Sequence, residues 1–256
     1  MFLFYVFIFF FGLIIGSFLN CLIWREYKEE TILGRSYCPN CKKQILWYDN
    51  IPLLSFILLK GRCRFCQQKI SWQYPLVEFL TGTLFVASFY YNFYILDFSL
   101  VNLFLSLFFI SFLIIVFVFD IRWFLIPVKL LLFGGIIIFL TNLYLGFSVG
   151  TILLSGVIGA GFFGIQYLIS KGKWIGEGDI WLGGFLGIAL ADFSKILLLI
   201  FLTYLVGGVS AMLLIIFGRR KIGSKLPLGI FLSVAALITL FFGQELIDWY
   251  LGLILL

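Results

Sequence analysis

Long apolar runs separated by short polar turns make up most of this chain and limit what it can fold into. Most of the runs approach the roughly 20 residues that a helix needs to cross a bilayer. Hydrophobic residues form 63% of the 256 residues and charged residues 12%, which excludes an ordinary soluble domain. The sequence therefore predicts an all-α polytopic membrane protein, a bundle of about eight transmembrane helices. The expected spans are Met1 to about Trp24, 74–94, 98–119, 125–145, 147–170, 179–192, 195–217 and 227–243.

These runs divide the chain into three expected parts: a first transmembrane helix at 1–24, a polar segment at 25–73 and a membrane bundle at 74–256. The first run has no basic stretch before it and no small-residue cleavage site after it. We therefore interpret it as a retained span and not as a signal peptide. The tail from Glu245 is expected either to form a half-span or to lie flat at the membrane interface.

Lysine and arginine residues gather at alternate turns between the runs. Half of the 18 lie in segment 25–73, whereas the intervening turns carry only Lys195. The positive-inside rule therefore predicts that the basic side is cytoplasmic. Lipid head groups are the expected partners of these residues, and we expect no binding to nucleic acid. The other basic turns contain Arg122, Lys129, Lys171, Lys173, Arg219, Arg220, Lys221 and Lys225.

Four of the five cysteines form two CxxC pairs within the polar segment. Cys38 and Cys41 are separated by 21 residues from Cys63 and Cys66, a spacing typical of four-thiolate zinc sites. Two disulfides are the alternative, but thiols stay reduced in the predicted cytoplasmic location. With four protein ligands the zinc ion would be structural and would hold a small loop domain together. Cys21, inside the first span, is expected to be a small packing residue.

Two acids lie at the ends of apolar runs on the predicted cytoplasmic side. Asp120 belongs to FDIRWFLIP, and Asp179 belongs to GEGD with Gly176 and Gly178 beside it. An acid at the edge of a membrane helix is costly and therefore a functional candidate. Two carboxyls within hydrogen-bonding reach share a proton, as an aspartic peptidase requires. The absence of histidine excludes catalysis that depends on an imidazole.

Each acid also has a structural interpretation. Asp179 could serve only as the N-cap of the following helix, and Asp120 could be an interfacial acid that pairs with Arg122. Glu78, just inside the second span, could face the protein interior or the head groups. Two other classes of protein remain open at this point. One is a transporter or channel with an intramembrane acidic site, and the other is a non-enzymatic assembly subunit whose zinc loop binds a partner.

Several motifs together resemble the type IV prepilin peptidases, a family of G-x-G-D membrane aspartic peptidases. They are GSFLN at 16–20, the two CxxC pairs around WYDNIPLLS, PLVEFLTG, DIRWFLIP and GEGD. The resemblance implies that Asp120 and Asp179 are catalytic. It also implies cleavage of the short basic leader from prepilin or pseudopilin precursors at the cytoplasmic face of the bacterial inner membrane. Many members also N-methylate the new terminus with S-adenosylmethionine, an activity associated with the cytoplasmic loop.

The chain departs from the usual pattern of that family at three positions. Val128 stands where an acid or amide often follows the Ile-Pro pair, and Trp181 stands where a lysine is common. Ile230 follows Gly229 where the family often carries Gly-Pro. These departures concern substrate docking and leave both candidate acids in place.

Overall fold

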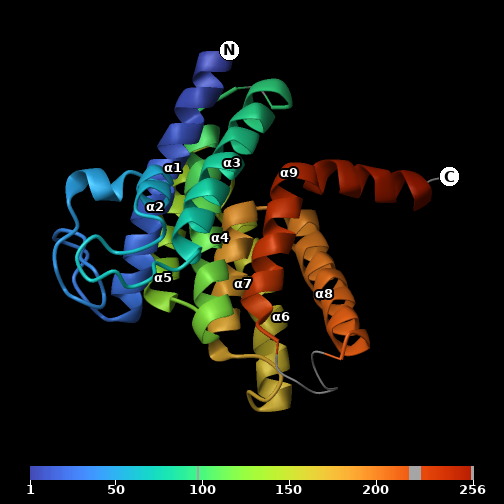
Figure 1. The fold of residues 1–256 in the computed structure, drawn as a ribbon. Coiled ribbons are helices and arrows are strands. Elements are labelled where there is room, and N and C mark those ends of the chain that lie inside the picture. Colours follow the sequence, from blue (N-terminus) through green and yellow to red (C-terminus); the bar gives the residue numbers. More distant parts are fainter. Residues whose placement is uncertain (97, 219–225, 255–256) are drawn as a thin grey trace. The chain divides into compact units, whose positions relative to one another are not determined.

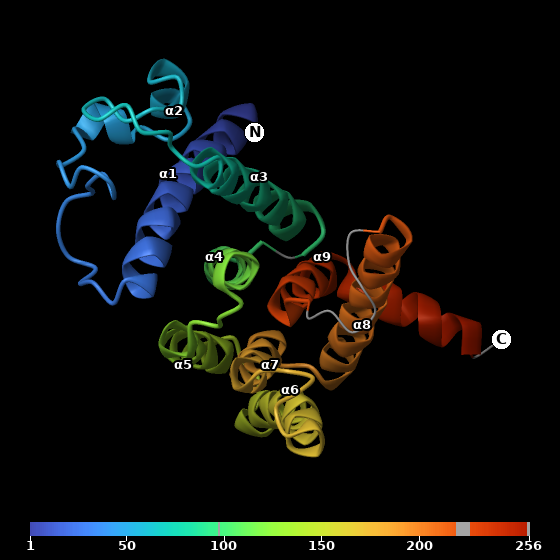
Figure 2. The ribbon, with the colours of Figure 1, turned by 60° about the horizontal axis from the view of Figure 1, so that its bottom comes forward.

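The computed structural model describes residues 1–256 except 97, 219–225 and 255–256. Asp97 and the basic residues at 219–221 and 225 therefore lie outside the described residues. The chain divides into two compact units, Met1–Ile115 and Val116–Leu256, and each is considered by itself. Figures 1 and 2 show the helices from two directions. Their bounds are α1 Phe2–Tyr27, η1 Trp47–Asn50, α2 Leu54–Leu58, α3 Gln73–Tyr94, α4 Leu100–Trp123, α5 Val128–Tyr144, α6 Val149–Ser170, α7 Glu177–Leu190, α8 Phe193–Ile216 and α9 Leu228–Ile254.

The prediction of an all-α membrane protein is confirmed. The described residues contain no strand, and their only β-type pairing consists of two isolated bridges in the polar segment. Five helices, α1, α4, α6, α8 and α9, are long and apolar enough to cross a membrane. The expected runs at 74–94, 125–145 and 179–192 are helical too, but α3 does not reach this threshold of apolarity, and α5 and α7 have only 17 and 14 residues. Eight crossings therefore stay a prediction.

The helix continues past residue 243, where the last span is expected to end. One helix, α9, runs from Leu228 to Ile254 without a break and includes Glu245. No charged residue interrupts 228–243, and the apolar pattern resumes after Asp248, so the polar residues at 244–248 are accommodated within the helix. Figure 1 shows that α9 changes direction along its length.

In the first unit, glycines allow α1 and α3 to pack with their backbones close together. A Cβ atom added to Gly12 would lie 2.6 Å from the Cα of Gly82, and one added to Gly16 would lie 2.7 Å from the Cα of Glu78. Such close approach of small residues is typical of helix pairs in membranes. The glycine of the GSFLN motif therefore has a packing role, and it places the first turns of α3 beside α1.

In the second unit, α7 packs against α6 with almost no side chain between the two helices. A Cβ on Gly159 would lie 2.2 Å from the carbonyl oxygen of Gly183, and one on Gly187 would lie 2.1 Å from the carbonyl oxygen of Ser155. Contacts this short leave no space for a methyl group. Because α7 begins beside Asp179, the packing of α6 against α7 also fixes the position of that acid.

This packing predicts opposite effects for two alanine substitutions on α6. Gly159→Ala inserts a methyl group against the α7 backbone and is expected to lower the free energy of unfolding by about 1–3 kcal/mol. Gly161→Ala is the matched control, because a Cβ there meets nothing within 4 Å. Alanine is more favourable than glycine within a helix by about 1 kcal/mol, so this variant is expected to unfold with a slightly higher free energy. Thermal unfolding in detergent measures both. Equal stabilities of the two variants would contradict the close packing.

Candidate active site

Asp179 lies in the first turn of α7 and is 7% exposed. The N-cap of that helix is Gly176, so Asp179 is the third helical residue and its alternative interpretation as the N-cap does not hold. Its Oδ2 accepts a hydrogen bond of 2.9 Å from the N–H of Gly176. A carboxylate at this position is favoured by the unpaired N–H groups and the dipole of the helix. This bond fixes one carboxyl oxygen of Asp179.

Asp120 lies in the last turn of α4 and is 5% exposed. Its Oδ2 accepts a hydrogen bond of 3.0 Å from the N–H of Ile230, 110 residues away in the first turn of α9. The first N–H groups of a helix have no partner within the helix. Asp120 therefore supplies an acceptor to α9 from a different segment of the chain.

Ile126 lies between the segments that hold the two acids. A Cβ on Gly178 would lie 2.7 Å from the Cβ of Ile126, and one on Gly229 would lie 2.9 Å from the Cδ1 of Ile126 and 2.8 Å from Oδ2 of Asp120. The N-termini of α7 and α9 thus meet around one isoleucine, and each of these N-termini donates to or carries one of the two candidate acids.

The turn that presents Ile126 has an unusual backbone. Phe124 has a φ of 55°, a left-handed conformation that is costly for a bulky residue, and its N–H donates to the carbonyl of Asp120 at 3.0 Å. The turn ends where α5 begins at Val128. Strained residues of this kind persist where the surrounding structure holds them, and they cluster at functional sites. Here the strained residue comes directly after the end of α4, the helix that carries Asp120.

The four predicted zinc ligands also come together. The Sγ atoms of Cys38, Cys41, Cys63 and Cys66 all lie within 4.8 Å of one another, and Cys38 and Cys66 are 3.9 Å apart. Thiolates at about 2.3 Å from a tetrahedral zinc ion are about 3.8 Å apart, so this donor set fits a structural metal. All four are free cysteines, and the alternative of two disulfides is absent from the described residues.

The two CxxC turns repeat the same local geometry. The N–H of Cys38 donates to the carbonyl of Lys43 at 2.9 Å, and the N–H of Cys63 donates to that of Gln68 at 2.9 Å. Lys42 and Gln67, directly after the second cysteine of each turn, both have a φ of 58°. Each turn therefore presents two sulfur atoms on one side, and the two turns together form a four-sulfur site.

Cys66 is held in a form suited to metal binding. The backbone hydrogen bond of Gln68 and then the side chain of Asn40 lower the pKa of Cys66 to about 6. The Nδ2 of Asn40 lies 3.6 Å from its Sγ. Because the thiolate is the form that binds metal, both contacts favour a ligand over a neutral thiol.

Comparison with known proteins gives the chain a family. The model described as "Bacterial Peptidase A24 N-terminal domain" matches residues 10–92, and the model described as "Type IV leader peptidase family" matches residues 107–212. A relative from Bacillus subtilis (strain 168) is 31% identical over 97% of this chain and 98% of its own length. The chain belongs to the type IV leader peptidase family.

Two further relatives also match the chain over most of its length. One from Aeromonas hydrophila is 31% identical over 97% of the chain and 94% of its own length, and one from Legionella pneumophila is 28% identical over 94% and 92%. All three relatives are named "Prepilin leader peptidase/N-methyltransferase". No solved structure matches the chain significantly.

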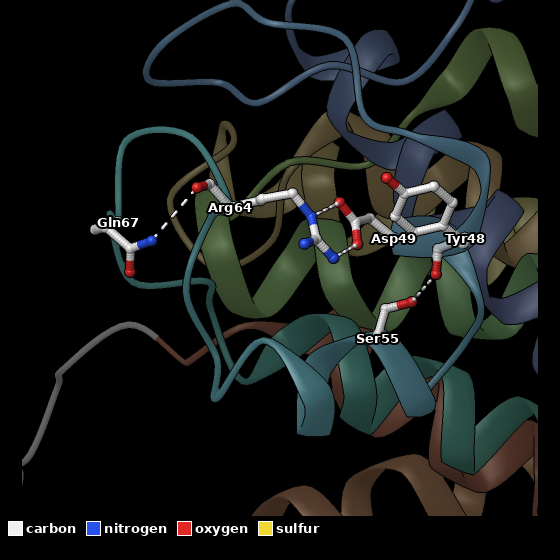
Figure 3. A network of polar contacts seen from close by, with 5 residues as sticks. All are labelled: Tyr48, Asp49, Ser55, Arg64 and Gln67. Carbon is white, nitrogen blue, oxygen red and sulfur yellow. Dashed lines mark hydrogen bonds and ion pairs between the residues drawn. The ribbon is translucent and has the colours of Figure 1, made fainter.

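In this leader peptidase family member, an ion pair connects the second CxxC turn to the short helix η1. Arg64 donates from Nε and Nη2 to the two oxygens of Asp49 at 2.7 and 2.6 Å (Figure 3). Beside it, the hydroxyl of Ser55 donates to the carbonyl of Tyr48 at 2.9 Å, and Gln67 donates to the carbonyl of Arg64. Bidentate pairs are the more specific form of ion pair. The network holds the WYDN turn against the cysteine turn.

Glu78 faces the protein interior, as one of the two sequence interpretations predicts. It is 7% exposed, and its Oε2 accepts a hydrogen bond of 2.8 Å from the N–H of Leu53. Leu53 has a φ of 58°, a conformation that costs energy for a side chain of this size. Glu78 therefore joins the polar segment to the first turns of α3.

Some contacts were missed from the sequence. In the first unit, Arg25 is 4% exposed and donates to the carbonyls of Thr31, Gly34 and Arg35 at 3.0–3.1 Å. Ile230 supplies the N–H from which Asp120 accepts a hydrogen bond, a bond that a proline could not make. The signal for Arg25 was a basic residue inside an apolar helix, but nothing in the sequence connects position 230 to Asp120.

A second missed feature is a polar pair between two apolar helices. The hydroxyl of Tyr204 on α8 donates to Oε1 of Gln166 on α6 at 2.7 Å. Polar side chains on apolar helices are candidates for functional contacts.

Proposed function

We propose that this protein is a membrane aspartic endopeptidase that removes the short basic leader from type IV prepilin or pseudopilin precursors. Asp120 and Asp179 are its catalytic pair. The observation that carries the proposal is the convergence of two buried acids around Ile126, each with one oxygen held by a backbone N–H. The names of the full-length relatives support the choice of substrate.

The chemistry follows from a pair that shares one proton. The charged carboxyl takes a proton from a water molecule while the water oxygen bonds to the scissile carbonyl carbon. The neutral carboxyl gives its proton to the carbonyl oxygen, which forms a tetrahedral diol. When the diol collapses, the C–N bond breaks, the amine receives a proton from one carboxyl and the other carboxyl regains one from the diol. The pair ends with the single proton with which it began.

Gly176 and Gly178 are the backbone support for this pair. The N–H of Gly176 fixes one oxygen of Asp179, and a side chain at 178 would collide with Ile126. The same acids in a transporter, or in an assembly subunit without chemistry, are less well supported, because the full-length relatives are named as peptidases.

Zinc is the metal we propose for Cys38, Cys41, Cys63 and Cys66, in a structural role. The bound ion would cross-link the two turns of a cytoplasmic domain at 25–73, between a first transmembrane helix at 1–24 and a peptidase bundle at 74–256. The lysine and arginine pattern supports a catalytic face on the cytoplasmic side of the bacterial inner membrane. Lipid head groups on that side are partners of the basic segment.

A second activity, N-methylation of the new terminus, is proposed for the same protein. The relatives carry both activities in their name. The methyl donor would be S-adenosylmethionine, whose sulfonium loses a methyl group to the terminal amine as the amine loses a proton. Segment 25–73 is the proposed location.

The test uses the purified protein in liposomes with a prepilin precursor, and mass spectrometry of the product. Loss of the leader is expected in every reaction, and an added methyl group only when S-adenosylmethionine is present. A precursor whose leader lacks its final glycine is the control and should remain intact. An intact precursor under conditions in which a relative cleaves it would contradict the proposal.

A further inference from the structure

The backbone N–H of Ile230 is a feature of the candidate site that catalysis by two acids does not itself require. We propose that this N–H is a positioning donor that stabilises the charged form of Asp120 and extends activity toward acidic pH. The inference rests on the proposed peptidase function. It concerns one backbone atom, so it can fail while that function stands.

Each acid has one carboxyl oxygen held by a backbone N–H. Oδ2 of Asp120 accepts from the N–H of Ile230 at 3.0 Å, and Oδ2 of Asp179 accepts from the N–H of Gly176 at 2.9 Å. Hydrogen bonds donated to a carboxylate favour its charged form. The pair is therefore expected to hold its one negative charge at lower pH than it would without Ile230.

The position of this donor at a helix start strengthens the effect. Gly229 and Ile230 are the second and third residues of α9, whose unpaired N–H groups carry partial positive charge. Residue 229 also requires a glycine, because a Cβ there would lie 2.8 Å from Oδ2 of Asp120. The close approach of α9 to Asp120 thus depends on Gly229, and the charge stabilisation depends on the N–H of Ile230.

The other charged groups around Asp120 stay constant when residue 230 changes. Asp179 and Glu177 both lie in the first turn of α7. Arg122 on α4 and Lys129 on α5 are the nearest basic residues along the chain, and 228–243 of α9 carries no charged side chain. A change in pH dependence after substitution at 230 therefore reports the lost N–H.

Ile230→Pro removes this donor with little disturbance of the helix. Proline is tolerated in the first turn, where the N–H has no partner within the helix. Ile230→Val is the matched control because it keeps the N–H and a branched side chain. A backbone ester at residue 230, made with an α-hydroxy acid, removes the N–H without a ring.

The experiment is the pH profile of leader cleavage by the full protein in liposomes. A hydrogen bond to a charged group contributes about 1.5–3 kcal/mol, and one pH unit corresponds to about 1.4 kcal/mol. The acidic limb of the profile should therefore move up by about one to two pH units in Ile230→Pro and in the ester. The KM and the rate on the plateau should stay within a few-fold of the parent, and Ile230→Val should match the parent.

Acidic limbs that coincide for all four proteins would overturn the inference and leave the peptidase proposal intact. A uniform fall in rate across the profile, or a rise in KM without a shift of the limb, would also overturn it, because either result indicates a purely structural role. A parent protein that cleaves no precursor would instead contradict the proposed function.

Discussion

Asp120→Asn and Asp179→Asn are each expected to lower the rate of leader cleavage by at least about 1,000-fold. Asparagine cannot take a proton from water or give one to the carbonyl oxygen, and general acid–base catalysis contributes about 10²–10⁴-fold per group. Loss of either member leaves the other without the shared proton, so each single substitution should be nearly as severe as both together. The rate is measured on a prepilin precursor with equal amounts of each variant.

The asparagine side chain should preserve the fold, so a lower cleavage rate in these variants reports lost catalysis. The Oδ1 of asparagine can still accept from Gly176 or from Ile230, so thermal unfolding in detergent should change little. Glu177→Gln is the matched control, because this exposed acid lies two residues from Asp179 in the same turn. Its cleavage rate should equal that of the parent. Processing at the normal rate by either aspartate variant would refute the assignment of the pair.

Replacement of Cys38, Cys41, Cys63 and Cys66 by serine is expected to unfold the polar segment while α1 and α3 remain helical. Structural zinc contributes about 10–16 kcal/mol of apparent binding energy in small zinc domains, far more than the few buried side chains of this segment supply. Limited proteolysis should cut within 28–72 in the variant and in protein treated with a chelator. Metal analysis should find one zinc ion per parent chain and none in the variant.

Cys21→Ser provides the control for this experiment. Cys21 lies on α1, outside the four-sulfur cluster, so its replacement should change neither the metal content nor the resistance of 28–72 to protease. Unchanged resistance after loss of all four cluster cysteines would mean that the segment needs no metal. That outcome would leave the two acids unaffected, since the cluster and the acids belong to different units of the chain.

Apolar runs and short motifs predicted the helices and the candidate groups because both depend on local sequence. The run at 98–119 corresponds to α4, and that at 195–217 to α8. The spacing of the CxxC pairs was enough to predict a four-sulfur cluster. The number of crossings could not be predicted, since polar residues such as Glu78 and Asn92 reduce the apolarity of α3, and α7 is shorter than a span.

Contacts from side chain to backbone were the part that the sequence could not reveal. Glu78 accepts from Leu53, and Asp120 accepts from Ile230. A backbone N–H is present at almost every position, so residue type and spacing do not indicate which N–H serves as a hydrogen-bond partner. Only the fold brings these groups together, and the packing of α7 through glycine backbones is hidden for the same reason.

The most direct test of the central claim is the separation of the Asp120 and Asp179 carboxyls in a structure with a bound precursor peptide. Our account predicts that both carboxyls lie within hydrogen-bonding reach, about 3 Å, of the scissile carbonyl or of one water molecule beside it. Carboxyls at opposite membrane surfaces, or one of them turned toward lipid with the peptide in place, would contradict it.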